Sequence, residues 1–258
     1  MFLVFNKQKI YAYVVSVITI VVLFCVANSV NLNKNTVQTS AKAEKLLPIY
    51  NVQTEEKKVA FTMNCAWNAD DIDSILKTLE ENNTKITFFM VGNWIEKFPE
   101  AVKKIHEAGH EIASHSDTHP HVNNLSYEKN IEEIEKSNDK IEKITGERTK
   151  IYRAPYGEYN DTVIKAAADK GYYTIQWNLD TLDYTGLTGE EMWNRIKDKI
   201  SPGDIILSHN GTKNTANSLD MLIKNIKQKG LVVVRVSDLI YMENYSINTN
   251  GTQIKNSN

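Results

Sequence analysis

The chain has 258 residues, enough for one large domain or two small ones. Its 30 Lys and Arg residues nearly balance its 32 Asp and Glu residues, so the charge gives no reason to expect a nucleic-acid partner. Only two cysteines occur, Cys25 and Cys65, which excludes a small scaffold stapled by disulfides. With 41% hydrophobic and 24% charged residues, the composition is that of an ordinary globular protein.

The N-terminus carries a targeting signal. Lys7 and Lys9 precede an uncharged apolar run from Ile10 to about Ala27. This run is near the lower limit for a membrane-spanning helix and is longer than most signal-peptide cores. Two expectations stay open: a retained single-pass anchor in the cell membrane, or a signal peptide that is cut near Ala27 and releases a secreted protein. In both, the lysines favour a cytoplasmic N-terminus and an exported domain.

Composition divides the chain into four parts. Residues 1–29 form the anchor or signal peptide. Residues 30–45 are rich in Asn, Thr, Ser, Gln and Lys and predict a flexible linker. Residues 46–243 form the globular domain, and the polar residues 244–258 predict a disordered tail.

Strand-like and helical segments alternate through the domain. Short β-rich runs predict strands at residues 59–63, 85–91, 111–114, 150–152, 172–176, 204–207 and 231–234. Helices are predicted between them, among them 71–82, 99–108 and 126–144. The apolar runs are continuous, as in strands that are buried on both faces. Seven such units with parallel crossovers predict an α/β fold, a closed or nearly closed β/α barrel.

Polar motifs follow several of these strands, where α/β barrels keep their catalytic groups. His115 and His119 are four residues apart and together can bind one divalent ion, most simply zinc. Further along comes Arg153-Ala-Pro-Tyr-Gly157, whose rigid turn would present the backbone amide of Tyr156 to a developing oxyanion.

Two more motifs complete the set. Asp180-Thr-Leu-Asp183-Tyr184 is followed by Leu207-Ser-His209 at the end of the sixth predicted strand. His209 could protonate a departing amine, and Asp183 could hold the required tautomer of that imidazole. The motifs therefore supply most of the groups that a metal-assisted amide hydrolase needs.

In this order the motifs resemble those of the polysaccharide deacetylase family, over roughly residues 46–241. The nearest likeness is to its membrane-anchored, sporulation-type branch in Gram-positive bacteria. The resemblance implies a distorted seven-stranded β/α barrel and a metal-dependent hydrolase that removes N-acetyl groups from cell-wall carbohydrate, peptidoglycan or chitin-like chains. The expected partners are this glycan and, through the N-terminal helix, the membrane. We expect the domain to be monomeric.

The resemblance also assigns roles by motif position. His115 and His119 would bind the metal, with zinc the expected ion. His209 would be the catalytic acid, and Tyr156 would contribute the oxyanion amide.

The remaining assignments concern the supporting residues. Arg153 would tether the base and Asp183 would orient the catalytic groups, unless the two form only a structural ion pair. Pro155 and Leu207 would contact the substrate. Trp67, on the loop after the first motif, would stack on a sugar ring or else pack in the core.

The first motif departs from the family pattern. The family's first strand usually ends in Thr-Phe-Asp-Asp-Gly, where the first Asp is the base and the second is a metal ligand. The aligned residues here run from Thr62 to Ala66, with Asn64 at the base position and Cys65 at the ligand position. A carboxamide cannot accept a proton from water. General-base catalysis contributes about 10²–10⁴-fold, so the loss should be severe.

Three replacements stay open. Cys65 as a thiolate would complete a His-His-Cys zinc site, unless it is a small buried thiol. Asp70 or Asp71 would supply a ligand or a base, unless both only cap the next helix. His209 would serve as both base and acid. The rival functions are a catalytically impaired homologue that binds wall glycans and a metal-dependent amidase with another substrate.

Overall fold

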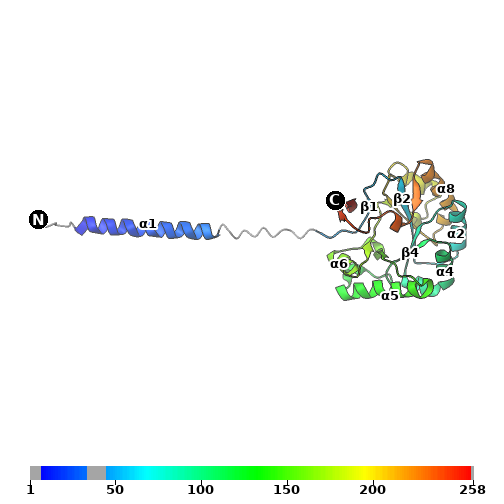
Figure 1. The fold of residues 1–258 in the computed structure, drawn as a ribbon, viewed down its shortest axis with the longest axis horizontal. Coiled ribbons are helices and arrows are strands. Elements are labelled where there is room, and N and C mark those ends of the chain that lie inside the picture. Colours follow the sequence, from blue (N-terminus) through cyan, green and yellow to red (C-terminus); the bar gives the residue numbers. More distant parts are fainter. Residues whose placement is uncertain (1–6, 34–44, 257–258) are drawn as a thin grey trace. The chain divides into compact units, whose positions relative to one another are not determined.

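The computed structural model describes residues 7–33 and 45–256, and the chain divides into two units, Met1–Lys45 and Leu46–Asn258 (Figure 1). In the first unit, α1 is a helix over Lys7–Asn33. Among the described residues, no helix is both long enough and apolar enough to cross a membrane. Most of the linker predicted at 30–45 lies outside the described residues.

Seven parallel strands form the centre of the second unit, in the spatial order β6-β5-β4-β3-β2-β8-β7. Their bounds are β2 Lys58–Cys65, β3 Thr87–Met90, β4 Glu111–Ser114, β5 Ile151–Tyr152, β6 Tyr173–Thr174, β7 Leu179–Asp180 and β8 Ile205–His209. The predicted α/β fold with a distorted seven-stranded barrel is confirmed. The strand predicted at 231–234 is β9 (Val232–Val234), which pairs with the first residues of β2 instead of ending the order.

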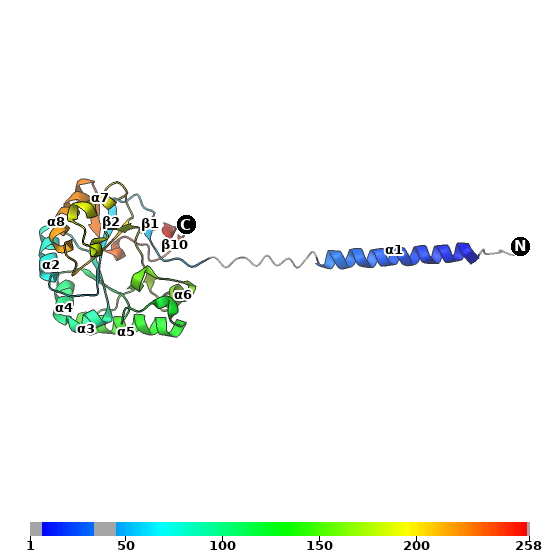
Figure 2. The same ribbon diagram turned by 180° about the vertical axis from the view of Figure 1, so that it is seen from behind.

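Helices cover the outside of these strands (Figures 1 and 2). They are α2 Ile72–Glu81, α3 Gly92–Lys97, α4 Pro99–Glu107, α5 Tyr127–Thr145, α6 Asp161–Asp169, α7 Gly189–Ile196 and α8 Thr215–Gln228. The longest, α5, begins after Ser126, whose side chain accepts a hydrogen bond from the Lys129 amide, and ends at Gly146 in the left-handed conformation.

Strand β2 has two buried faces with different neighbours. Phe61, Met63 and Cys65 belong to the apolar cluster that the strands share with the surrounding helices. Ala60 belongs to a separate cluster inside the barrel. Thr62 and Asn64 are two and four residues further along the strand, so they face the same side as Ala60. Successive residues of β2 therefore lie on opposite sides of the sheet.

The N-terminal end of the domain crosses from the end of β6 to the start of β8. Ile49 forms a parallel bridge to Ile175, just after β6, and Asn51 forms an antiparallel bridge to Asp204, just before β8. Strand β1 (Asn51–Val52) continues this segment. The entry segment is therefore part of the barrel wall.

The expectation of a disordered tail is wrong for the residues that the structure describes. Strands β10 (Tyr245–Ile247) and β11 (Thr252–Lys255) form an antiparallel hairpin, and β11 pairs in parallel with β1. Gln253 is fully buried, and its amide accepts from the Tyr241 nitrogen at 2.8 Å and donates to the Tyr241 carbonyl at 2.6 Å. Backbone pairing and one buried amide order a segment whose composition is polar.

We predict that Gln253→Ala lowers the free energy of unfolding by about 2–3 kcal/mol, because two buried backbone hydrogen bonds lose their partner. Urea unfolding measures the change. The exposed Ser246→Ala on the same hairpin serves as control, with an expected effect within about 0.5 kcal/mol. Equal effects for the two variants would contradict an anchoring role for Gln253.

Candidate active site

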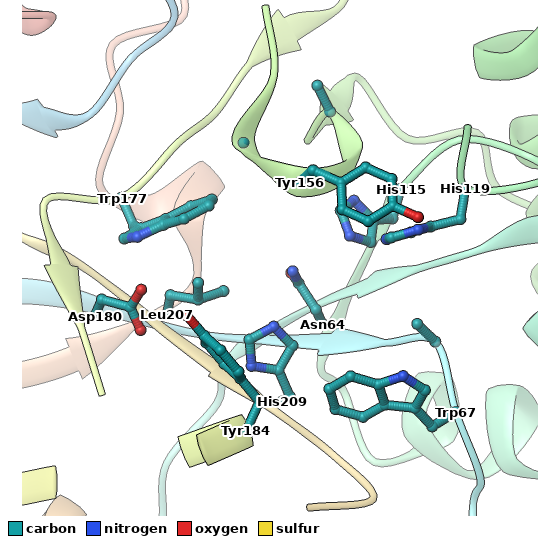
Figure 3. Close-up of a pocket in the computed structure, with 13 residues that line it drawn as sticks. Asn64, Trp67, His115, His119, Tyr156, Trp177, Asp180, Tyr184, Leu207 and His209 are labelled. Atoms are coloured by element: carbon teal, nitrogen blue, oxygen red, sulfur yellow. The ribbon is translucent and has the colours of Figure 1, made fainter. Parts of the chain in front are cut away.

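A cavity of about 500 Å³ lies where the polar motifs meet (Figure 3). The motifs follow β2, β4, β5, β7 and β8, so the carboxyl ends of the strands bring them together, as the sequence predicted. Its lining residues are Asn64, Ala66, Trp67, His115, His119, Ala154, Tyr156, Gly157, Trp177, Asp180, Tyr184, Leu207 and His209.

The two histidines of the second motif lie side by side, with ring centroids 5.0 Å apart. Nδ1 of His115 donates to the Arg153 carbonyl at 2.8 Å, which leaves Nε2 as an acceptor. Burial lowers the pKa of both imidazoles, and that of His115 falls well below its ordinary value. Both rings are therefore neutral at pH 7, which is the form that binds metals.

The loop that carries these histidines is held by Glu133 of α5. One carboxylate oxygen accepts from the amides of Asp117 at 2.9 Å and Thr118 at 2.8 Å, and the other accepts from the Thr118 hydroxyl at 2.9 Å. Ser116 and His119 have φ values of 65° and 59°, a conformation that costs non-glycine residues free energy. The hydrogen bonds to Glu133 offset this strain and fix the loop.

Arg153 lies inside the barrel, fully buried behind the cavity floor. Its Nη1 donates to Thr62 Oγ1 at 2.9 Å and to Asn64 Oδ1 at 3.0 Å. Its remaining hydrogen bonds go to backbone carbonyls, and its guanidinium carbon lies 3.9 Å from the centre of the Phe89 ring. Every described acceptor is neutral, and burial lowers the pKa of Arg153 to about 9. Arg153 therefore holds the Asn64 amide at the position where the resemblance to the family places the base.

His209 and Asp183 form a second buried unit. Nδ1 of His209 donates to Asp183 at 2.8 Å, and the backbone amide of His209 donates to the same carboxylate at 2.6 Å. The Thr215 hydroxyl adds a third hydrogen bond at 2.7 Å. Asp183 therefore orients the His209 ring by accepting from its Nδ1. The alternative of an ion pair between Arg153 and Asp183 is wrong, since the described partners of each lie elsewhere.

Aromatic rings form the rim of the cavity (Figure 3). Trp67 is 49% exposed and lies 5.4 Å from the His209 ring, and Tyr184, 52% exposed, contacts the same ring edge-on at 5.4 Å. Tyr156 has φ 56° and stacks on His121 at 4.3 Å. Trp67 is therefore a rim residue and not a core residue. Pro155 is buried beneath the turn and does not line the cavity, unlike Leu207.

Several contacts at the rim were not predicted from the sequence. His121 pairs with Glu158 at 2.6 Å, and Trp177 lies under Gly157, where a Cβ would come within 3.0 Å of its ring. Gly157 also has φ 68°, so this turn requires glycine. A glycine in this turn indicates that another group lies close to the backbone, but the sequence alone does not identify that group as Trp177.

The donors present do not fit a catalytic zinc with three protein ligands. Cys65 points into the outer apolar cluster, and burial raises the pKa of its thiol well above the ordinary value. Asp70 is exposed, while Asp71 accepts from Asn210 Nδ2 at 3.1 Å and from the Gly211 amide at 2.7 Å. Among the described residues, no group of three or more His, Cys, Asp or Glu side chains could hold a metal. The expected third ligand from Cys65 or Asp70 is therefore not found.

We predict that Cys65→Ser leaves zinc binding unchanged, because the thiol faces away from the histidine pair. His119→Ala should lower the affinity for zinc, because it removes one of the two neighbouring imidazoles. Isothermal titration with zinc measures both. Loss of zinc affinity in Cys65→Ser would show that the thiolate turns toward the cavity.

We predict that Asn64→Asp makes the free energy of unfolding more dependent on pH. Arg153 would hold the pKa of the new carboxyl in the folded protein below its usual value of about 3.9, so the added stability is fully present above about 3.9 and is lost as the pH falls from there through the lower folded-state pKa. We expect a gain of about 1–3 kcal/mol relative to wild type between pH 3 and pH 6. Urea unfolding across this range measures it, and parallel pH profiles for the two proteins would contradict it.

Comparison with known proteins places the chain among its relatives. The family described as Polysaccharide deacetylase matches residues 51–175. A peptidoglycan-N-acetylglucosamine deacetylase of Bacillus cereus is 30% identical over 196 residues, which cover 74% of this chain and 92% of that protein. The protein YlxY of Bacillus subtilis is 36% identical over 193 residues, or 75% of this chain, but the chain covers only 60% of YlxY.

Solved structures of similar fold include a protein that lacks activity. BA3943 of Bacillus anthracis, a CE4 family pseudoenzyme, has a TM-score of 0.72 at 30% identity, covering 82% of this chain and 73% of that chain. A mutant of BA3943 with restored enzymatic activity gives the same TM-score at 33% identity, covering 76% and 71%. With the motifs gathered around one cavity and relatives of this similarity, the chain belongs to the polysaccharide deacetylase family.

Proposed function

We propose that this protein binds N-acetylated cell-wall glycans in the deacetylase cavity and that its hydrolytic activity is largely lost. The observation that carries the proposal is the amide of Asn64 at the base position, held by Arg153 at 3.0 Å. An amide cannot take a proton from water, and removing a general base typically costs about 10²–10⁴-fold in rate.

The cavity keeps the features that bind a sugar. Exposed rings of Trp67, Tyr156 and Tyr184 border it, and such rings offer flat apolar faces for stacking. The interior combines the apolar Leu207 with a few polar groups, which is the usual composition of a small-molecule site. Binding needs these groups and does not need a base.

The relatives support both halves of the proposal. The Bacillus cereus relative is named for peptidoglycan N-acetylglucosamine, which supports a cell-wall glycan as the ligand. The BA3943 pair supports the idea that this fold persists without activity and regains it by mutation. A glycan ligand of this kind agrees with the export expected from the lysine-flanked apolar run at the N-terminus.

One observation favours a second candidate, a slow deacetylase. Asp183 and His209 keep the geometry of an orienting carboxylate and a proton-transferring imidazole. With Nδ1 bound to Asp183, Nε2 of His209 is able to take a proton from water and return it to the leaving nitrogen. In this candidate one residue serves as both base and acid, so the activity would be low.

We predict that wild type releases no more acetate from peptidoglycan or N-acetylglucosamine oligomers than His209→Ala does, with zinc supplied. Asn64→Asp should release more than wild type, because Arg153 then holds a proton acceptor. Enzymatic acetate detection measures release, and titration calorimetry with a chelator measures binding of the same oligomers to wild type.

The outcomes separate the candidates. Binding without acetate release is the result we expect. Acetate release by wild type that disappears in His209→Ala would contradict the proposal and support the slow deacetylase. If wild type shows no binding of the oligomers and no acetate release, both candidates are overturned.

A further inference from the structure

The orientation of the Asn64 amide follows from its neighbour. A guanidinium has only donors, so the group that faces Arg153 Nη1 at 3.0 Å must be the carbonyl oxygen of Asn64. The nitrogen then faces the other way, and Figure 3 shows it pointing into the cavity. No described residue accepts a hydrogen bond from this nitrogen, although the side chain is only 5% exposed.

The change from carboxylate to amide therefore reverses the hydrogen-bonding sense of the cavity floor. An Asp at position 64 would offer acceptors only, whereas Asn64 offers a donor. The Nε2 atoms of His115 and His209 are acceptors, since their Nδ1 atoms donate to the Arg153 carbonyl and to Asp183. The floor thus presents one directed amide donor beside imidazole acceptors.

This arrangement matches an intact acetamido group. Its carbonyl oxygen needs a donor, which Asn64 Nδ2 supplies, and its N–H needs an acceptor, which Nε2 of His209 supplies. Its methyl needs an apolar wall, and Leu207 and Trp177 line the same cavity. A deacetylated sugar carries an ammonium instead, which has three donors and a charge. It would meet the Asn64 donor, with the buried cation of Arg153 behind it.

Building on the proposed function, we infer that Asn64 is a specificity-determining residue: its Nδ2 donates to the acetamido carbonyl, so the protein distinguishes acetylated from deacetylated wall glycan. The ligand is the uncleaved acetamido group itself. The substitution that removes the base also supplies the contact that recognises this group.

The test compares two probes, the tetramer of N-acetylglucosamine and the tetramer of glucosamine, by titration calorimetry of the full-length chain with a chelator present. Wild type should bind the acetylated tetramer about tenfold more tightly, the effect of one buried hydrogen bond made or left unmade. Asn64→Asp exchanges the donor for an acceptor of the same shape. This variant should bind the acetylated tetramer about tenfold more weakly than wild type does, and it should bind the cationic tetramer more tightly.

Asn93→Asp is the matched control, because Asn93 is exposed at the start of α3, does not line the cavity, and changes the net charge equally. It should bind both tetramers as wild type does. Equal binding of both tetramers by wild type would overturn the inference while leaving the proposed function in place. If Asn64→Asp still binds the acetylated tetramer more tightly than the deacetylated one, the inference is overturned as well. Binding of neither tetramer would overturn the proposed function.

Discussion

The buried guanidinium of Arg153 is the constraint on which the centre of this domain depends. It lies inside the barrel with its charge fully removed from water. From the end of β5 it reaches Thr62 and Asn64 on β2 and the carbonyl of Ile175, just after β6. Burying a cation is costly, so each of its donors has to be satisfied. The backbone carbonyl of Arg153 itself accepts a hydrogen bond from Nδ1 of His115 and fixes the orientation of that ring. One residue thus sets both the base position and the histidine orientation.

The partner of that cation decides the chemistry. An Asp at position 64 would form a charge-assisted hydrogen bond and could accept a proton, whereas Asn64 satisfies the same donor as a neutral group. The packing around the guanidinium is therefore compatible with either residue. His209, which pairs in register with Asn64 on the neighbouring strand β8, forms its own side-chain network with Asp183 and Thr215. The hydrogen bonds that orient the His209 ring do not involve the side chain at position 64.

Much of this arrangement was predictable from the sequence. Parallel strands end at one edge of the barrel, so polar motifs after apolar runs had to meet there, and a contact between Asp183 and His209 was expected. The position of Cys65 was also within reach, because residues 64 and 65 of a buried strand face opposite sides. The two-residue strand β7 and the polar strands β10 and β11 were missed, since backbone pairing and the buried Gln253 amide leave little trace in composition.

The Glu133 contacts have a consequence for how the site tolerates change. In many metal sites the ion itself organises the ligand loop, and losing the metal means losing the fold. Here a carboxylate of α5 holds the amides of Asp117 and Thr118, so protein hydrogen bonds support the shape of the loop between His115 and His119. This support comes from α5 and not from the first motif. A substitution at Asn64 or Cys65 therefore leaves these hydrogen bonds in place.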